Sequence, residues 1–220
     1  MKIVKASYEI LAMHFDLELL ERCGRTCYKS EEKITEDSAP AFAKMLLDRG
    51  HHAMVEFGGW MAVKFVCDRG VSHELVRHRL FSFAQESTRY CNYGKDKFGS
   101  EITVIDPRPA FKQLLCAPLP AGATELFAEW LDAMETAEAH YIWLIKQGAS
   151  PQMARSVLPN SLKTEVNVAG NAREWRHFFS LRAAKPAHPQ MREVACPLLR
   201  HLRLNVPMLF DDVGDVEADQ

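Results

Sequence analysis

The stretch GWMAVKFVC, residues 59–67, is rich in β-branched and aromatic residues. A run of this length and composition is typical of a largely buried strand. Residues 68–70, Asp-Arg-Gly, interrupt it. A helix is then predicted over residues 71–80, with an apolar stripe formed by Val71, Leu75, Val76 and Leu80.

Further elements are predicted on both sides of this strand and helix. Helical spacing of apolar residues predicts helices over residues 15–30, 37–49, 123–147, 171–184 and 189–204, and Ser150 with Pro151 begins another. Shorter apolar runs predict strands over residues 2–12, 102–105 and 162–168. Because the strands are few and separated, we expect an α+β fold, a small and mostly antiparallel sheet packed with several helices.

The length of the chain fits a single domain spanning residues 1–220. The stretch over residues 117–123, rich in Pro, Gly and Ala, is the only candidate linker. The acidic tail over residues 211–220 is expected to be frayed.

Composition narrows the function classes. Hydrophobic residues make up 47% of the chain and charged residues 25%, as in a soluble globular protein. The net charge of −2 provides no global basic field, so neither a nucleic-acid nor a membrane partner is expected. The six cysteines are scattered without a zinc pattern, and neither a signal peptide nor a membrane span is recognisable. We therefore expect a cytoplasmic protein with free thiols.

The first chemical cluster is Arg77, His78 and Arg79. On a regular helix Arg77 and Arg79 point about 200° apart, so they cannot both hold one small anion. Either the helix ends here, or the two arginines serve different ligands or subunits. The structural alternative is a solvated basic face in which Glu74 pairs with Arg77 or His78.

Two hydroxyls and a guanidinium follow at Ser87, Thr88 and Arg89. Hydroxyls, backbone N–H groups and a bidentate arginine are what phosphate recognition requires. A serine nucleophile at Ser87 is disfavoured, because no Gly-x-Ser-x-Gly elbow surrounds it. The region is thus predicted to bind an anion.

The helix over residues 171–184 places Arg182 on the same stripe as the apolar residues Trp175, Phe178 and Phe179. A charged group on an inward face is costly unless it is paired. Either Arg182 snorkels out at the helix end, or a ligand supplies its partner. On another face Arg173 and His177 lie four residues apart, which suits a second ligand.

The arrangement Arg77-His78-Arg79, seven residues, then Ser87 and Arg89-Tyr90, resembles the signature of the flavin-dependent thymidylate synthases. Three further segments are similar to that family: 50–57 with His51 and Glu56, 154–159 with Arg155, and 171–182. The sequence departs from the pattern at Ala53, Phe57, Ala84 and Gln85. The resemblance covers residues 50–93 and 148–195.

The resemblance implies reductive methylation of dUMP to dTMP. Methylenetetrahydrofolate would give the carbon, and FAD, reduced by NADPH or NADH, the hydride. Arg182 would activate the uracil ring, with no protein nucleophile and no metal, in a homotetramer with shared sites. The implied dUMP contacts are Glu74, Arg77, Gln85, Glu86, Ser87, Thr88, Arg89, Arg155 and Arg182. The implied FAD contacts are His51, Ala53, Arg77, His78, Arg79, Gln85, Asn171, Ala172, Arg173 and His177.

Three other functions compete with this one. A nucleic-acid module based on the Arg-His-Arg cluster lacks a continuous basic stripe. A metal-dependent hydrolase would use His51, His52, His73 and His78, but no carboxylate–histidine motif accompanies them. A catalytically inactive relative is the stronger alternative, given Ala53 and Phe57.

Overall fold

The computed structural model describes residues 1–110 and 123–214. The chain divides into two compact units, each made of three segments. Unit 1 comprises residues 1–7, 65–75 and 84–166, and unit 2 comprises residues 8–64, 76–83 and 167–220. The chain passes between them five times, after residues 7 and 75 and within β3 (Gly59–Asp68), β4 (Ser82–Gln85) and β6 (Lys163–Asn171). A single domain over the whole chain stays a prediction.

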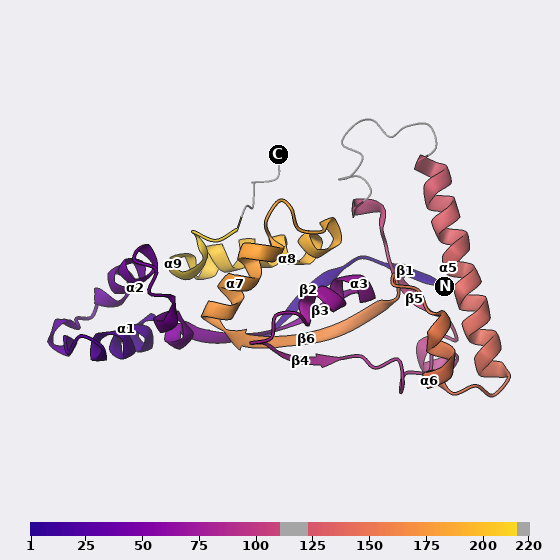
Figure 1. Ribbon diagram of the computed structural model, residues 1–220, viewed down its shortest axis with the longest axis horizontal. Helices are drawn as coiled ribbons and strands as arrows, with labels where there is room; N and C mark the ends of the chain where they lie inside the picture. The colour runs from indigo at the N-terminus through magenta and orange to yellow at the C-terminus, as the bar shows by residue number, and fades with distance from the viewer. Residues whose placement is uncertain (111–122, 215–220) are drawn as a thin grey trace. The chain divides into compact units, whose positions relative to one another are not determined.

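The strands form a four-stranded sheet in the order β2-β3-β6-β4, with β2 at Ser7–Phe15 (Figure 1). Backbone hydrogen bonds join Asp16 to Gly58, Arg69 to Asn160 and Glu86 to Glu165. The end of each strand thus lies beside the start of its neighbour, and the sheet is antiparallel. The α+β class and the antiparallel sheet are confirmed, although the predicted strand over residues 2–12 is two strands.

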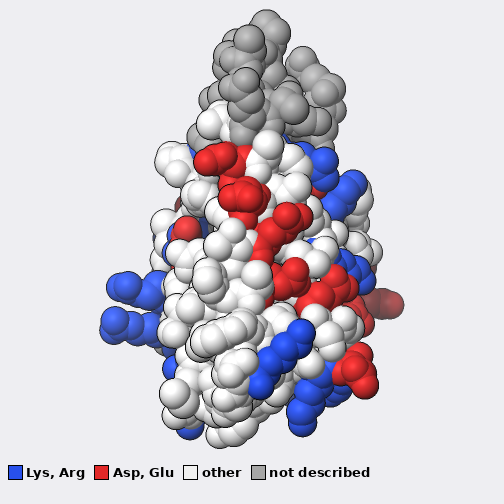
Figure 2. Space-filling view, turned by 90° about the vertical axis from the view of Figure 1, so that its right-hand side faces the viewer, with Lys and Arg blue, Asp and Glu red and all other residues white. Residues whose placement is uncertain are grey.

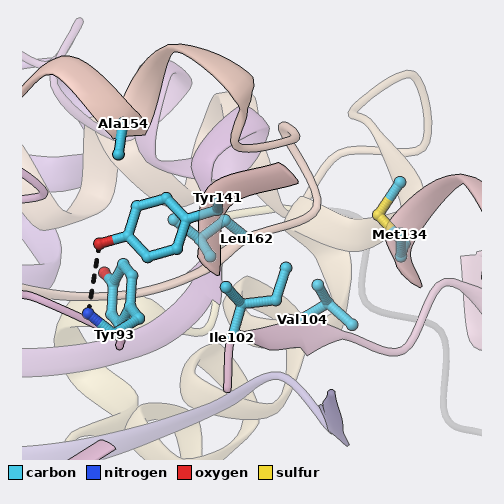
Figure 3. Close-up of a cluster of buried hydrophobic side chains, with 7 residues drawn as sticks. All are labelled: Tyr93, Ile102, Val104, Met134, Tyr141, Ala154 and Leu162. Atoms are coloured by element: carbon cyan, nitrogen blue, oxygen red, sulfur yellow. Dashed lines mark hydrogen bonds between the residues drawn. The ribbon is translucent and has the colours of Figure 1, made fainter. Parts of the chain in front are cut away.

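Strand β1 (Lys2–Val4) is the first of the two strands found where one strand was predicted. It pairs in parallel with β5 (Thr103–Ile105) in unit 1. Helix α5 (Ala123–Lys146) belongs to the same unit and buries Met134 and Tyr141, which lie seven residues apart on one face. They pack in a cluster with Tyr93, Ile102, Val104, Ala154 and Leu162 (Figure 3). The predicted helix over residues 123–147 is confirmed.

The outer side of α5 is acidic. Glu129, Asp132 and Glu135 are exposed at helical spacing, and the view toward this side shows a band of acidic side chains (Figure 2). Carboxylates at this density repel a phosphate. We therefore expect the predicted anion site to lie on another side of unit 1. None of the helices in residues 1–110 and 123–214 has the length and apolar character needed to cross a bilayer.

Unit 2 contains most of the helices. They are α1 (Leu17–Thr26), α2 (Ser38–Asp48), α7 (Ala172–Arg182), α8 (Pro189–Asn205) and α9 (Pro207–Phe210), with the 3₁₀ segments η1 (Glu31–Lys33) and η2 (His52–Gly58). Helix α7 packs against η2 and α8 (Figure 1). Its residues Trp175, Phe178 and Phe179 are fully buried, and the Trp175 indole donates to the carbonyl of Met61 at 3.1 Å.

Three predicted boundaries are wrong. Helix α3 covers only Arg69–Leu75, so the Arg-His-Arg cluster follows it and Leu80, 74% exposed, is not part of an apolar stripe. The helix opened by Pro151 is the single turn α6 (Pro151–Ala154), continued by the 3₁₀ turn η4 (Arg155–Val157). The tail is not frayed from Asp211, since Val213 is buried. Residues 215–220 and most of the predicted linker lie outside the described residues.

The glycine before β3 gives a test of the fold. Gly59 has a φ of +126°, and a Cβ there would lie 2.6 Å from the Cα of Phe15 and closer still to the carbonyl oxygen of His14. Neither backbone atom can move without disturbing β2, so Gly59→Ala is expected to lower the free energy of unfolding by about 3 kcal/mol or more.

Gly50→Ala is the matched control. Gly50 also has a positive φ, +71°, but no atom lies within 4 Å of its added Cβ. Its loss should be only about 1 kcal/mol, the cost of a left-handed residue alone. Equal losses in urea denaturation would show that the close approach to β2 contributes nothing.

Candidate active site

The predicted site residues fall into two groups, one within each unit. Unit 1 holds Glu74, Gln85, Glu86, Ser87, Thr88, Arg89 and Arg155. Unit 2 holds His51, Ala53, Arg77, His78, Arg79, Asn171, Ala172, Arg173, His177 and Arg182. Most of the residues predicted for dUMP therefore lie in unit 1 and most of those predicted for FAD in unit 2, with Arg77, Arg182 and Gln85 as the exceptions.

The turn over residues 87–89 is the centre of the unit 1 group. The carbonyl of Ser87 accepts from the N–H groups of Tyr90 and Cys91, and its Oγ accepts from Arg89 N at 3.3 Å. Thr88 is buried, with its Oγ1 3.5 Å from Nη1 of Arg155. The backbone turn thus presents a hydroxyl to a guanidinium that comes from a distant part of the sequence.

Beside this turn lies a hollow of about 420 Å³. Its polar lining includes Arg69, His73, Thr88, Gln152 and Arg155, and the described lining residues contain no Asp or Glu. A concave site with two arginines, a hydroxyl and no carboxylate favours an anion. The anion-binding character predicted from the sequence therefore has a matching surface in unit 1.

Two residues of the unit 1 group are held inside the protein. The Gln85 amide donates to the hydroxyls of Ser72 at 2.9 Å and Thr164 at 3.3 Å. The Glu86 carboxylate accepts from the Tyr93 hydroxyl at 3.0 Å and from Nζ of Lys163 at 3.1 Å. Glu74 is half-buried on α3. Direct contacts of these three residues with a ligand stay predictions.

In unit 2, the residues of the Arg-His-Arg cluster point to different surroundings. Arg77 and Arg79 are exposed, whereas His78 is buried with 4% of its surface accessible. The helix ends before the cluster, which was one of the two possibilities left by the sequence. The alternative of a solvated basic face describes the two arginines but is wrong for His78.

His78 has an unusual hydrogen-bonding state. Nε of Arg182 donates to its Nε2 at 3.1 Å, so a neutral ring carries its proton on Nδ1. Nδ1 is buried and has no hydrogen-bond partner within residues 1–110 and 123–214, and Oε1 of Glu174 lies 3.5 Å from it. Burial, and then the positive charges of Arg182 and His177, lower the pKa of His78 to about 4. Burial raises the pKa of Glu174.

Arg182 therefore has a partner that the sequence did not predict. It is the last residue of α7 and is half-buried, and it neither snorkels free nor depends on a ligand for all of its pairing. The two residues of this pair are 104 positions apart in the sequence. Such a contact has no local signal.

A second hollow, of about 600 Å³, lies along the exposed side of α7. Arg173, His177 and Ser180 line it at spacings of four and three residues, as predicted for the first two. Nη1 of Arg173 contacts Oε1 of Glu56 at 2.6 Å. The segment 50–57 and the start of α7, which the resemblance had linked, are thus joined directly by an ion pair.

The remaining residues of the unit 2 group differ in accessibility. His51 and Ala53 are exposed at η2, where Ala53 offers no hydroxyl. Asn171 caps α7 by accepting from Glu174 N at 3.0 Å. Ala172 is fully buried beside Gly58, so its side chain packs the core and only its backbone could contact a ligand.

The histidines proposed for a metal-dependent hydrolase do not form one site. Among the described residues, the only group of potential metal ligands within 4.8 Å of one another is His78, Glu174 and His177. It excludes His51, His52 and His73. A cation there would meet the guanidinium that already donates to His78, so the arrangement disfavours a metal.

Comparisons with known proteins identify the family of this chain. The family model described as thymidylate synthase complementing protein matches residues 10–208. Flavin-dependent thymidylate synthases of Corynebacterium glutamicum and Corynebacterium aurimucosum are 35% and 37% identical over 202 and 201 residues, 88% of this chain and 78% of each relative. The chain belongs to the flavin-dependent thymidylate synthase family. It is an enzyme of the methyltransferase class.

A further relative and a solved structure are also similar to this chain. The flavin-dependent thymidylate synthase of Geobacter sulfurreducens is 32% identical over 198 residues, 87% of this chain and 79% of the relative. The crystal structure of the UMP/dUMP methylase PolB from Streptomyces cacaoi, bound with 5-Br dUMP, is 22% identical and has a TM-score of 0.77 over 96% of both chains. The second likeness establishes the fold.

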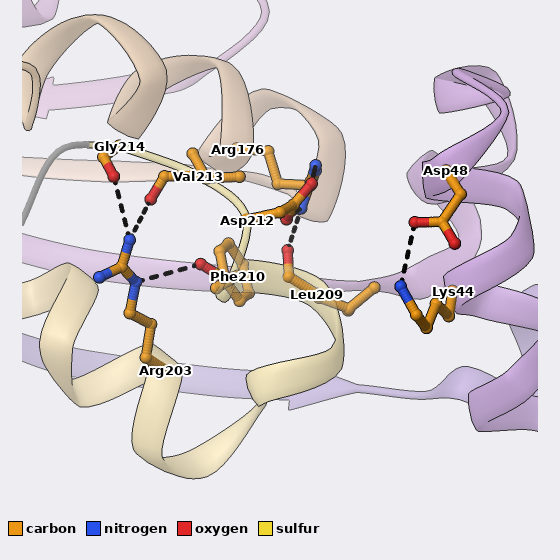
Figure 4. Close-up of polar contacts among 9 residues, drawn as sticks. All are labelled: Lys44, Asp48, Arg176, Arg203, Leu209, Phe210, Asp212, Val213 and Gly214. Atoms are coloured by element: carbon orange, nitrogen blue, oxygen red, sulfur yellow. Dashed lines mark hydrogen bonds and ion pairs between the residues drawn. The ribbon is translucent and has the colours of Figure 1, made fainter.

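Sequence reasoning missed the pair of Arg176 and Asp212 in this family member. Arg176, whose side chain is 8% exposed, donates to both oxygens of Asp212 at 2.6 and 2.7 Å and to the carbonyl of Leu209 (Figure 4). The hydrogen bond from Arg176 lowers the pKa of Asp212. Both residues line the hollow along α7. An arginine beside Trp175 in an apolar stripe was the available signal.

Asp212→Ala tests this pair. The change leaves a buried guanidinium with only the Leu209 carbonyl, so we expect the free energy of unfolding to fall by about 1–3 kcal/mol. Asp48→Ala, which breaks the exposed pair of Lys44 and Asp48, is the control and should cost about 0.5 kcal/mol or less. A smaller loss for Asp212→Ala than for the control would contradict a stabilising role for the pair of Arg176 and Asp212.

His78 gives a pH test. Its pKa is about 4 in the folded protein and near 6.5 unfolded, so the unfolded chain binds the extra proton between these values. Stability should therefore be constant above pH 6.5 and fall by on the order of 3 kcal/mol as the pH drops to 4. His78→Gln should remove this slope, measured by urea denaturation at each pH. An unchanged slope in that variant would assign the effect to other groups.

Proposed function

We propose that the enzyme methylates dUMP at C5 to give dTMP, with methylenetetrahydrofolate as the carbon donor and FAD, reduced by NADPH or NADH, as the hydride source. Family membership supports the reaction class. The observation that carries the proposal is that the chain contains two groups of side chains suited to this reaction. One is an anion-binding turn with Arg155, and the other is a buried His78 paired with Arg182.

In this proposal the nucleotide phosphate binds in the hollow of unit 1. Thr88 and Arg155 supply a hydroxyl and a guanidinium there, and Ser87 and Arg89 continue the same turn. Nε of Arg89 donates to Oε1 of Gln152 at 3.1 Å, which orients its guanidinium. A planar, charge-assisted donor set of this kind matches a phosphate better than a neutral ligand.

The hollow along α7 fits a flavin group by two criteria. Its volume, about 600 Å³, is within the range of cofactor sites. Nδ1 of His78, a buried polar atom with no hydrogen-bond partner among the described residues, lies 3.5 Å from Oε1 of Glu174, which lines this hollow. Arg173 and His177, with His51, Arg77, Arg79 and Asn171 as the other predicted contacts, would hold the dinucleotide. When bound and reduced, FAD supplies the hydride.

Arg182 would stabilise negative charge that develops on the uracil ring. A guanidinium acts as a preorganised donor only if its orientation is fixed before the reaction. The hydrogen bond from Nε to His78 provides this orientation. Because His78 stays neutral down to about pH 4, it accepts this bond throughout the physiological range.

The proposal assigns no protein nucleophile. Burial raises the pKa of Cys67 to about 12 and also raises that of Cys91, so both are poor thiolates. Oγ of Ser87 already accepts a hydrogen bond within its own turn. We also propose that the enzyme is a homotetramer with shared sites and that it is cytoplasmic. The rival is an inactive relative, because Ala53 and Phe57 replace a hydroxyl and a histidine.

Tritium release from 5-tritiated dUMP, with methylenetetrahydrofolate, FAD and NADPH, tests the function. The wild-type enzyme should release tritium, and Arg182→Ala should reduce the rate by about 100-fold or more. Arg49→Ala, which removes an exposed arginine at the end of α2, is the control and should leave the rate unchanged.

Two outcomes would contradict the proposal. Near-normal turnover in Arg182→Ala would remove the assigned role of this residue. A wild-type protein that binds added FAD but releases no tritium would favour the inactive relative. Flavin binding is followed separately by absorbance.

A further inference from the structure

We infer that Tyr93 and Lys163 are positioning residues for the substrate phosphate, and that they act through Glu86. The inference rests on the proposed function and deepens it, since it concerns the nucleotide half of that site. It also gives Glu86 a different role from the one the family resemblance implies. Its carboxylate holds the phosphate-binding turn in place and does not itself contact the nucleotide.

Glu86 is anchored at four polar groups. One carboxylate oxygen accepts from the Tyr93 hydroxyl at 3.0 Å and the other from Nζ of Lys163 at 3.1 Å. Its N–H donates to the carbonyl of Glu165 at 2.9 Å, and its carbonyl accepts from Nη1 of Arg69 at 3.4 Å. Both carboxylate oxygens are thus engaged within the protein, and the side chain is 14% exposed.

The position of Tyr93 is fixed from the core of unit 1. The residue is buried, and its N–H donates to the Tyr141 hydroxyl at 3.2 Å (Figure 3). Its ring packs against those of Phe98 and Tyr141. Burial, and then the negative charge of Glu86, raise the pKa of Tyr93. Its hydroxyl therefore stays protonated and donates to Glu86 at any physiological pH.

Lys163 neutralises the carboxylate beside the anion site. It lies on β6 with its ammonium between Glu86 and Glu165, at 3.1 and 2.7 Å, and is 20% exposed. Burial opposes its charge, but the hydrogen bonds to Glu165 and Glu86 outweigh this and raise the pKa of Lys163. Without this cation, Glu86 would place an uncompensated negative charge one residue before the turn that is proposed to bind phosphate.

The anchor is connected to the turn by the backbone. Ser87 follows Glu86 directly, and its carbonyl accepts the N–H groups of Tyr90 and Cys91, which closes the turn around Thr88 and Arg89. Loss of either Glu86 bond allows the start of this turn to move. The hydroxyl of Thr88 is only 3.5 Å from Arg155, a distance at which small shifts separate the two groups.

Tyr93→Phe is the decisive variant, because it removes one hydroxyl and keeps the ring in the core. Dissociation constants are measured by calorimetry on the full chain for dUMP and for deoxyuridine, which lacks the phosphate. We expect the constant for dUMP to rise about tenfold, as for an unsatisfied acceptor, and that for deoxyuridine to stay unchanged. Lys163→Met should act in the same direction, and Lys163→Arg should restore binding.

Tyr8→Phe is the matched control. It removes a tyrosine hydroxyl that donates to the carbonyl of Pro197 at 3.3 Å within unit 2. This variant should leave the ratio of the two dissociation constants at its wild-type value. If Tyr93 had a purely structural role, its loss would weaken the binding of dUMP and deoxyuridine equally. A positioning role changes the ratio of the two dissociation constants. Where Tyr93→Phe does not fold, the Lys163 variants give the same readout.

The outcomes separate this inference from the proposed function. An unchanged ratio in both Tyr93→Phe and Lys163→Met would overturn the positioning role even if the wild-type enzyme turns over. Selective loss of dUMP binding in a protein that releases no tritium would support the positioning role and reject the function. A wild-type chain that binds no dUMP would overturn both.

Discussion

The burial of one face of α7 determines the geometry of unit 2. Trp175, Phe178 and Phe179 are removed from water, and the indole of Trp175 is tied to the backbone of β3. A helix is rigid, so fixing one face fixes all of them. Arg173 and His177 are therefore directed into the hollow, and Arg182 reaches His78 at the helix end. Apolar desolvation thus orients the polar groups that line this hollow.

In unit 1, hydrogen bonds fix the orientation of the polar groups. The turn over residues 87–89, which we propose binds phosphate, has Thr88 as its only buried residue. Glu86 holds the turn because its polar groups have partners on three segments, the loop with Tyr93, strand β6 and helix α3. The cluster around Tyr141 supplies the rigid support for this network.

Periodicity predicted the long helices and the buried strand β3, because a single buried face or strand leaves a signal within a few residues. Composition and spacing also singled out the turn over residues 87–89, whose role in phosphate binding stays a prediction. The end of α3 at Leu75 was missed, because it depends on the burial of His78 among Phe178, His177 and Arg182, about a hundred residues away. The pair of Arg176 and Asp212 and the support of Glu86 by Tyr93 were missed for the same reason. Lys163 and Glu165, two apart on one strand face, did carry a local signal.

The division of the chain has a consequence for how such an enzyme can evolve. Each unit is assembled from three separated segments, and the chain changes unit five times along its length. Neither unit is a contiguous stretch of the gene, so the exchange of one continuous segment cannot replace a unit intact.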